Sequence, residues 1–261
     1  MTQQTEFGQE LVAEKALIAR EVVRVYKGSS SPALNGLNIS VNQGEIFGLL
    51  GPNGAGKTTA ISIMSTLLRP TRGSITIYGI DIVRYPNEAK KLLSLVPQEI
   101  ALYPNLTARE NLSYFGRLYG LRGQQLENRI WESLELVGLK QKGDERVFTF
   151  SGGMKRRANL AAGILSRPRL LFLDEPTVGI DAQSRNMILE KLALLKNTGT
   201  TMIYTTHYME EAELLCSSVV IIDNGQSIAE GNPQELIDRT PGCSSLQDVF
   251  FALTGKSIRD S

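Results

Sequence analysis

The segment EIFGLLGPNGAGKTT, residues 45–59, decides the fold class. Its apolar start, EIFGLL, predicts a buried strand, and the run from Lys57 to Leu68 predicts a helix. Between them, GPNGAGKT fits the pattern G-x-x-x-x-G-K-[ST], which in a strand–loop–helix setting marks a phosphate-binding loop. We therefore expect nine consecutive residues to contact a nucleotide: Gly51, Pro52, Asn53, Gly54, Ala55, Gly56, Lys57, Thr58 and Thr59.

Each residue type in this loop has a chemical reason to be there. Glycines let the backbone curl so that successive amide N–H groups point at phosphate oxygens. The helix that follows offers free N–H groups and the positive end of its dipole. Lys57 supplies a positive charge between the β- and γ-phosphates, and the Thr58 hydroxyl is a ligand for Mg²⁺. The loop thus predicts a nucleoside triphosphate bound with magnesium.

A second segment, LLFLDEP at residues 170–176, is an apolar run that ends in two acids. A buried parallel strand reads this way, and its carboxyl end lies at the edge of the sheet where ligands bind in open α/β folds. Asp174 can hold Mg²⁺ directly or through water. Glu175 can orient or deprotonate an attacking water molecule. On its own the segment is a common strand ending. Together with a phosphate loop it indicates the magnesium and catalytic residues of a nucleotide site.

The third segment is FSGGM at residues 150–154. Ser151 is a good helix N-cap, and Gly152 and Gly153 leave the first amides of the helix unobstructed. The chain therefore owns two helix N-termini that suit an anion, although one nucleotide needs only one. Taken alone, this segment would rather be interpreted as an ordinary capped helix that begins after a glycine turn.

Around these segments, short apolar strands alternate with helical runs. LNISV, SITIYG, LLSLVPQ, TTMIYTTH and SSVVIIDNG all have the texture of strands, and QSIAEG reads as the hairpin partner of the strand before DNG. Residues 104–165 are helical in pattern. This alternation predicts an α/β fold: a phosphate-loop NTPase (RecA-like) core of mostly parallel sheet, an antiparallel β subdomain and an inserted helical subdomain.

Composition narrows the class of partner. The 261 residues carry 28 Lys and Arg against 27 Asp and Glu, a balance without the excess of positive charge that nucleic-acid binding usually requires. Cys216 and Cys243 have no metal-site or redox spacing, so we expect reduced thiols. The polar N-terminus does not resemble a signal peptide, and no run approaches the ~20 apolar residues that span a bilayer.

With these three segments in order, the sequence resembles the ATP-binding cassette (ABC) family, the nucleotide-binding domains of ABC transporters, from about Ala16 to Thr254. The resemblance implies that FSGGM completes the ATP site of an opposite subunit, so that two chains enclose two ATP molecules. It also assigns four further residues. Tyr26 in RVYKG stacks on adenine; Gln98 in VPQE contacts Mg²⁺ and the attacking water; Asp181 in VGID crosses to the partner; His207 in TTH lies beside the γ-phosphate.

The resemblance further implies the partners and the location of the chain. We expect an ATPase that dimerises with a second nucleotide-binding subunit, here a homodimer, and drives a separate transmembrane permease. Nucleic acid is not expected as a partner. The chain would lie at the cytoplasmic face of the cell membrane, held there peripherally through the permease.

Two positions depart from the family pattern. Met154 stands where the signature LSGGQ has a polar residue, and methionine cannot donate a hydrogen bond. Ile180 stands where leucine is more usual, a swap that conserves volume. With the ending SLQDVFFALTG, these variants are similar to the exporter branch that includes bacterial drug- and antibiotic-efflux ATPases.

Two other readings remain open. A soluble ABC-type ATPase of translation, DNA repair or cofactor assembly shares the site, although such translation factors usually carry two cassettes and DNA-repair relatives carry long coiled coils. A nucleotide kinase or GTPase shares the phosphate loop but has no use for FSGGM. A neighbouring gene with about six apolar spans of roughly 20 residues would favour transport.

The expected domain boundaries follow from these patterns. Residues 1–15 are a flexible lead-in, residues 16–240 form the ATP-binding domain, and the helical subdomain occupies about 86–165. Residues 241–261 form a C-terminal amphipathic segment that packs on the domain, with apolar residues at helical spacing: Leu246, Val249, Phe250 and Leu253.

One predicted helix of the subdomain has two apolar stripes instead of one. Around residues 108–119, one stripe consists of Leu112, Phe115 and Tyr119, and a second consists of Tyr114, Leu118 and Leu121. One stripe suffices to hold a surface helix to its own domain. The second stripe is therefore either buried within the subdomain or exposed as an interface, and the family resemblance favours docking of the permease there.

Overall fold

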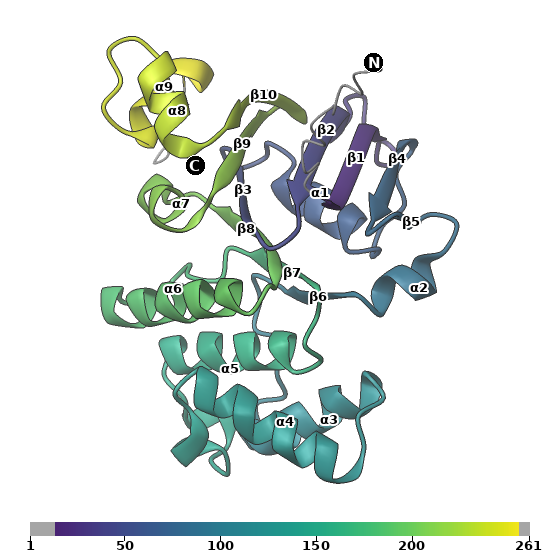
Figure 1. Ribbon diagram of the computed structural model, residues 1–261, viewed down its shortest axis with the longest axis vertical. Helices are drawn as coiled ribbons and strands as arrows, with labels where there is room; N and C mark the ends of the chain where they lie inside the picture. The colour runs from purple at the N-terminus through teal and green to yellow at the C-terminus, as the bar shows by residue number, and fades with distance from the viewer. Residues whose placement is uncertain (1–13, 256–261) are drawn as a thin grey trace, which may run out of the picture.

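The computed structural model describes residues 14–255 of the chain, and two sheets organise them (Figure 1). A six-stranded sheet has the order β10-β9-β3-β8-β7-β6, and a four-stranded sheet has the order β2-β1-β4-β5. The strands are β1 Lys15–Arg24, β2 Leu34–Asn42, β3 Ile46–Leu50, β4 Arg72–Ile77, β5 Ile80–Asp81, β6 Leu93–Val96, β7 Leu170–Asp174, β8 Thr201–Thr206, β9 Ser218–Asp223 and β10 Gln226–Gly231.

Nine α-helices lie among the described residues. They are α1 Lys57–Met64, α2 Pro86–Lys90, α3 Ala108–Leu118, α4 Gly123–Leu136, α5 Gly152–Ile164, α6 Ala182–Asn197, α7 Met209–Leu215, α8 Pro233–Arg239 and α9 Leu246–Thr254. The sequence predicts that this first helix extends to Leu68, but α1 ends at Met64. Thr66 adopts the left-handed region, with φ 68°, and so breaks the helical path.

The six-stranded sheet is the core of the fold. Its neighbours β9-β3-β8-β7-β6 all run parallel, and β10 alone is antiparallel, joined to β9 by the turn at Asn224 and Gly225. Both turn residues have positive φ, 48° and 74°, as the tight hairpin turn requires. The apolar strands are buried because helices cover both faces of a parallel sheet.

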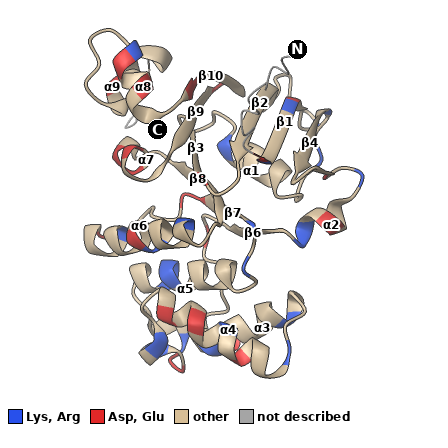
Figure 2. Ribbon diagram, in the orientation of Figure 1, with Lys and Arg blue, Asp and Glu red and all other residues tan. Residues whose placement is uncertain are grey.

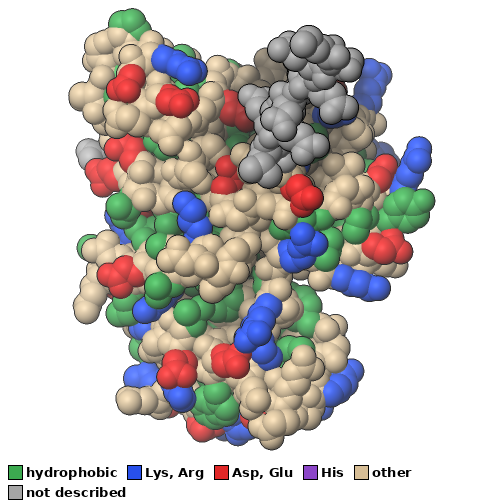
Figure 3. All heavy atoms as spheres, viewed as in Figure 1, with side chains coloured by type: hydrophobic (Ala, Val, Ile, Leu, Met, Phe, Trp, Pro, Cys, Tyr) green, Lys and Arg blue, Asp and Glu red, His purple; other side chains and the backbone are tan. Residues whose placement is uncertain are grey.

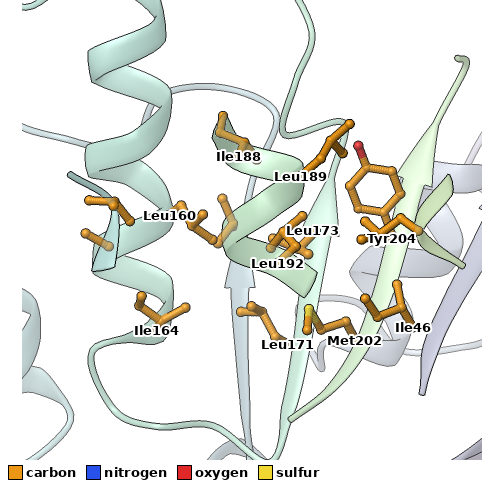
Figure 4. Packing of buried hydrophobic residues seen from close by; sticks show 14 of the residues in the cluster. Ile46, Leu160, Ile164, Leu171, Leu173, Ile188, Leu189, Leu192, Met202 and Tyr204 are labelled. Atoms are coloured by element: carbon orange, nitrogen blue, oxygen red, sulfur yellow. The ribbon is translucent and has the colours of Figure 1, made fainter. Parts of the chain in front are cut away.

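Side chains of each central strand alternate between two apolar layers. Leu171 and Leu173 of β7 face the layer of α5 and α6, which Figure 4 shows from close by. Leu170 and Phe172 face the opposite layer, which contains the buried side of α1. Because successive side chains of a strand point to opposite faces, α1 and α5 lie on opposite faces of the sheet.

The four-stranded sheet is antiparallel throughout and packs over α1, in agreement with the expected antiparallel subdomain. Among its buried residues are Leu17, Val41 and Ile75, which share one apolar cluster with Ile61 of α1. This packing fixes the first half of the nucleotide site against the core sheet.

The segment proposed as a helical subdomain, about 86–165, also contains strand β6, which pairs with β7 in the core sheet. Because β6 is the edge strand of the core sheet, it does not belong to a helical insertion, and the part of the segment that contains helices and no strand runs from Ala108 to Ile164. In it, α3, α4 and α5 pack on one another through Leu112, Ile130 and Leu165.

The C-terminal helices pack on α7. In α9, Leu246, Val249 and Phe250 are buried, whereas Leu253 is 43% exposed, so the expected apolar stripe is buried only over its first two turns. The lead-in proposed for residues 1–15 lies outside the described residues except for Glu14 and Lys15, and Lys15 already begins β1. Within residues 14–255, no helix combines the length and the apolar character that crossing a membrane requires.

Candidate active site

The order of the strands brings three loops to one place. Strands β6, β7 and β8 are consecutive neighbours, and the loops after their carboxyl ends carry Gln98, Glu175 and His207. Strand β3, on the other side of β8, leads into the phosphate loop and Lys57. Carboxyl ends of neighbouring parallel strands meet at one edge of the sheet, where ligands bind in such folds.

The phosphate loop closes tightly between β3 and α1. Gly56, the N-cap of α1, has φ 106°, and a Cβ there would lie 2.5 Å from the carbonyl oxygen of Ala33, so only glycine fits. Lys57 is 6% exposed and curls back over the loop: its Nζ donates to the carbonyl oxygens of Gly51 at 2.8 Å and Pro52 at 3.1 Å. Burial lowers the pKa of the Lys57 amine, and Glu175 and Asp174 partly offset that effect.

Asp174 ends β7 beside the start of α1. Its Oδ1 accepts a hydrogen bond of 2.8 Å from the Thr205 hydroxyl. Burial raises the pKa of the Asp174 carboxyl, while hydrogen bonds from the hydroxyls of Thr205 and Thr58 act in the opposite direction. The two predicted magnesium ligands, Thr58 and Asp174, are therefore direct neighbours.

Glu175 is the centre of the site. Its carboxylate lies 3.7 Å from Lys57 Nζ, accepts from Gln98 Nε2 at 3.5 Å and lies 3.2 Å from His207 Nδ1. The hydrogen bond with His207 is the main cause that lowers the pKa of this carboxyl. Glu175 also has φ 46°, a left-handed conformation that costs a non-glycine residue on the order of 1–3 kcal/mol. Such strain is maintained only where surrounding contacts determine the geometry.

Tyr26 lies near this group but is separate from its carboxylates. Its hydroxyl is 3.2 Å from the Thr59 hydroxyl at the start of α1, and its ring is 40% exposed. The Arg24 guanidinium lies 5.0 Å from the ring centre on one side. An accessible ring beside the phosphate loop is what base stacking requires.

The signature residues form a second group. Ser151 caps α5, its hydroxyl accepting from the Met154 amide at 3.2 Å, and Ser151 and Gly152 are exposed. The Met154 side chain packs against the apolar layer of α5 and α6. The methionine that departs from the family pattern therefore makes an internal contact of the domain.

Asp181 belongs to this second group. It caps α6, accepting from the amide of Ser184 at 2.9 Å and from its hydroxyl at 2.8 Å, and these bonds lower the pKa of its carboxyl. A Cβ on Gly153 would lie 2.1 Å from the Ser184 hydroxyl oxygen, so the signature turn and the start of α6 touch. Two loops distant in sequence thus form one exposed surface.

Two residues that the sequence reasoning missed connect the groups. Arg156 of α5 donates to the carbonyl oxygen of Gln98 and, at 3.2 Å, to that of Val178. Asn159, one turn later and buried, accepts from the Ala101 amide at 3.1 Å and donates to the Pro97 carbonyl at 3.2 Å. Their only sequence signal is a run of polar residues on a helix, which reads equally well as a solvated face.

Comparison with known proteins agrees with this arrangement. The family model for ABC transporters matches residues 34–178. The linearmycin resistance ATP-binding protein LnrL of Bacillus subtilis (strain 168) is 50% identical over 228 residues, which are 87% of this chain and 72% of that protein. The similarity thus extends to a drug-resistance ATPase, the branch that the sequence resembled.

Two solved structures support the same assignment. An ATP-binding subunit of an ABC transporter superposes with a TM-score of 0.81 at 29% identity, covering 92% of this chain and 99% of that one. An ATP-binding cassette solved as a dimer in a post-hydrolysis state, bound to ADP and Pi, superposes with a TM-score of 0.76 at 25% identity, covering 83% and 98%. The chain belongs to the ABC transporter family and is one of its ATP-binding, ATP-hydrolysing subunits.

Proposed function

We propose that this chain hydrolyses ATP at the carboxyl edge of the core sheet to drive a separate membrane permease, and that the permease exports an antibiotic-like compound. The observation that carries the catalytic part is the Glu175 carboxylate, which contacts Lys57, Gln98 and His207 together. The triphosphate lies along the loop from Gly51 to Thr59, with the adenine on the ring of Tyr26.

Each contact of Glu175 has a role in that reaction. The lowered pKa keeps this carboxylate ionised at neutral pH, so it accepts a hydrogen bond from the attacking water and orients it. His207 holds the carboxylate by its Nδ1, and we expect the γ-phosphate to bind beside this pair. Lys57 moves from the carbonyl oxygens of its own loop to the phosphate oxygens, where a charge-assisted hydrogen bond is stronger.

The residues present also fit a magnesium ion. Thr58 and Asp174 offer a hydroxyl and a carboxylate side by side, and the amide oxygen of Gln98 would be a further ligand; oxygen donors are the ligands that Mg²⁺ prefers. Bound there, the ion would neutralise charge on the β- and γ-phosphates.

The exposed second group supports a dimer. Ser151, Gly152 and Asp181 are exposed, and α5 lies on the opposite face of the sheet from the phosphate helix α1. A helix N-terminus that lies across the sheet from its own phosphate loop is suited to a nucleotide held by a second copy. We propose a homodimer with two ATP molecules at the interface, the symmetric arrangement most common among oligomers.

A surface on the helical part fits the permease. Tyr103 is 49% exposed and Tyr114 is 43% exposed, and their rings meet edge to face with centres 5.3 Å apart. Leu118 and Phe148 are also exposed. We call these four residues the aromatic surface; exposed apolar patches of this kind mark partner sites. Of the second stripe, Tyr114 and Leu118 are therefore exposed on α3, whereas Leu121 lies beyond the end of the helix and packs against the core.

Charge on the molecule is compatible with a protein partner. Lys and Arg residues are interspersed with Asp and Glu along the ribbon (Figure 2) and on the face that Figure 3 draws. Such a mixture supports protein contacts over binding to a phosphate backbone. Docking through the aromatic surface would hold the chain at the cytoplasmic face of the membrane, and the name of LnrL supports export of a drug-like substrate.

The test of the transport part is co-purification with the product of a neighbouring permease gene. We expect Tyr103→Ser and Tyr114→Ser to weaken that association and transport. ATP affinity of the isolated chain should stay within about twofold, since surface changes away from a site typically cost under ~0.5 kcal/mol. Tyr85→Ser, at a tyrosine that is 56% exposed and directly precedes α2, is the matched control. Variants that bind ATP, copurify and transport at wild-type levels would place the docking site elsewhere.

A further inference from the structure

A buried carboxylate that no predicted role uses lies beneath the catalytic edge. Helix α7 carries three glutamates; Glu210 and Glu213 are exposed, whereas Glu211 is 3% exposed. A buried carboxylate is costly unless it is paired and hydrogen-bonded. Its partners therefore indicate why the fold keeps a charge there.

One oxygen of Glu211 collects three hydroxyl donors. Its Oε2 accepts from Tyr204 at 2.6 Å, from Thr206 at 2.8 Å and from Thr177 at 3.0 Å. Burial, and then the nearby Glu211, raise the pKa of the Tyr204 phenol, so that this hydroxyl stays protonated and donates. The other oxygen, Oε1, lies 3.5 Å from Nε of Arg185.

The partners lie on segments next to three of the predicted site residues, Glu175, His207 and Asp181. Thr177 lies two residues after Glu175, and Thr206 directly precedes His207. Arg185 is on the first turn of α6, where its amide donates to the carbonyl oxygen of Asp181 at 3.0 Å. Figure 4 shows Tyr204 beside Leu189 of α6, in the layer between the sheet and that helix.

A second path runs from Glu211 to the histidine ring. The Thr206 hydroxyl also accepts from the Tyr208 amide at 3.0 Å, which fixes the turn that contains His207. The Arg185 guanidinium lies 4.3 Å from the centre of the Tyr208 ring, and that ring lies 4.2 Å from the His207 ring. The histidine is thus held from the backbone side by Thr206 and from the ring side by Tyr208.

We infer that Glu211 is a positioning residue for ATP hydrolysis: it holds the loops of Glu175 and His207 in register with each other and with the loop of Asp181. This inference rests on the catalytic roles proposed for Glu175 and His207. A buried ion pair is a weak source of stability, because apolar residues of similar volume often replace one without loss. What a three-donor carboxylate adds is fixed geometry, and a misplacement of about 1 Å can cost 10²-fold in rate.

The test is Glu211→Gln, which keeps the size of the side chain and one acceptor oxygen but removes the charge. We expect kcat for ATP hydrolysis to fall about 10- to 100-fold, with KM and ATP affinity within about twofold of wild type. Glu210→Gln, at the exposed neighbour on the same helix, is the matched control and should keep wild-type kcat. A combined Glu211→Gln and Arg185→Gln variant should lose less than the product of the two single effects, because the residues act as a pair.

Other outcomes separate the inference from the proposed function. If Glu211→Gln keeps kcat within twofold while Glu175→Gln is inactive, the positioning role is wrong and the catalytic role stands. If Glu175→Gln and His207→Ala both hydrolyse ATP at wild-type rates, the proposed roles fail and the inference falls with them. If Glu211→Gln does not fold, Thr177→Val, which removes one donor at constant volume, carries the same test of kcat against KM.

Discussion

The two helix N-termini that we expect to bind phosphate, at the starts of α1 and α5, differ in the number of reactive groups around them. At the start of α1, Lys57 is 6% exposed, and Glu175, 8% exposed, lies 3.7 Å from its amine. At the start of α5, Ser151 and Gly152 are exposed, and the Ser151 hydroxyl accepts a hydrogen bond from the Met154 amide in the first turn of the same helix. The first terminus is surrounded by reactive groups of the same chain, whereas the second presents an open surface. This difference is what the proposed two-chain arrangement requires, in which one chain supplies the catalytic half of one site and the signature half of the other.

We expect the largest effect from a substitution of Glu175, in the group of residues around the start of α1, which we call the enclosed half of the site. Glu175→Gln keeps the shape of the side chain but cannot accept a proton, so we expect hydrolysis to slow by at least ~10²-fold while ATP binding persists. The variant should accumulate as an ATP-bound dimer. Phosphate release and size-exclusion chromatography with Mg-ATP measure the two effects, with Glu190→Gln at an exposed position as the control. Normal turnover would refute the role of Glu175, and a monomer alone would count against the two-chain site.

A smaller loss is expected from the lysine of the same half. Lys57→Ala removes the cation of the phosphate loop, and a charge-assisted hydrogen bond is worth roughly 1.5–3 kcal/mol, or about 10- to 150-fold in affinity. Calorimetry of ATP binding is the measurement, and Lys91→Ala, at an exposed lysine, is the control. Unchanged affinity would mean that the backbone amides bind the phosphates without help from Lys57.

Tyr26→Ala tests whether the exposed tyrosine ring beside the phosphate loop stacks on the adenine base. Loss of ring stacking on the base should weaken ATP binding by about 1–3 kcal/mol without changing kcat at saturation. Because stacking accepts any purine, the wild-type chain should also hydrolyse GTP. Titration of both nucleotides decides the point: a strict preference for ATP would show that hydrogen bonds read the base.

The smallest signal, and the sharpest test of the comparison, comes from mixing two defective chains. Ser151→Arg keeps its own phosphate loop, and Lys57→Ala keeps its own signature. If the halves of a site come from different chains, half of the dimers in an equal mixture have one intact site, and roughly a quarter of wild-type ATPase activity should return. No recovery in proven heterodimers would mean that both sites must fire together or that the signature acts within its own chain.

Some of the site could be predicted because its cause is local. The side chains of Ser151 and Asp181 each accept a hydrogen bond from the amide three residues later, of Met154 and Ser184 respectively. Neighbouring residues in the sequence are therefore enough to predict both helix caps. The phosphate loop was readable for the same reason, since its glycines and Lys57 act within one turn of chain. The helical boundary near residue 86 was misplaced because LLSLVPQ is too short to show which elements cover it.

What the sequence by itself determined is therefore the set of reactive groups and the local turns that present them. The tertiary structure decided which groups meet. Gln98 and Glu175 are 77 positions apart and His207 is 32 from Glu175, and they converge only because β6, β7 and β8 are neighbours in the sheet. Likewise, the order of residues in MEEAEL does not tell which glutamate is buried. Packing of α7 against β8 turns Glu211 toward Tyr204 and leaves Glu210 in water, because burial depends on contacts between segments that the local pattern does not encode.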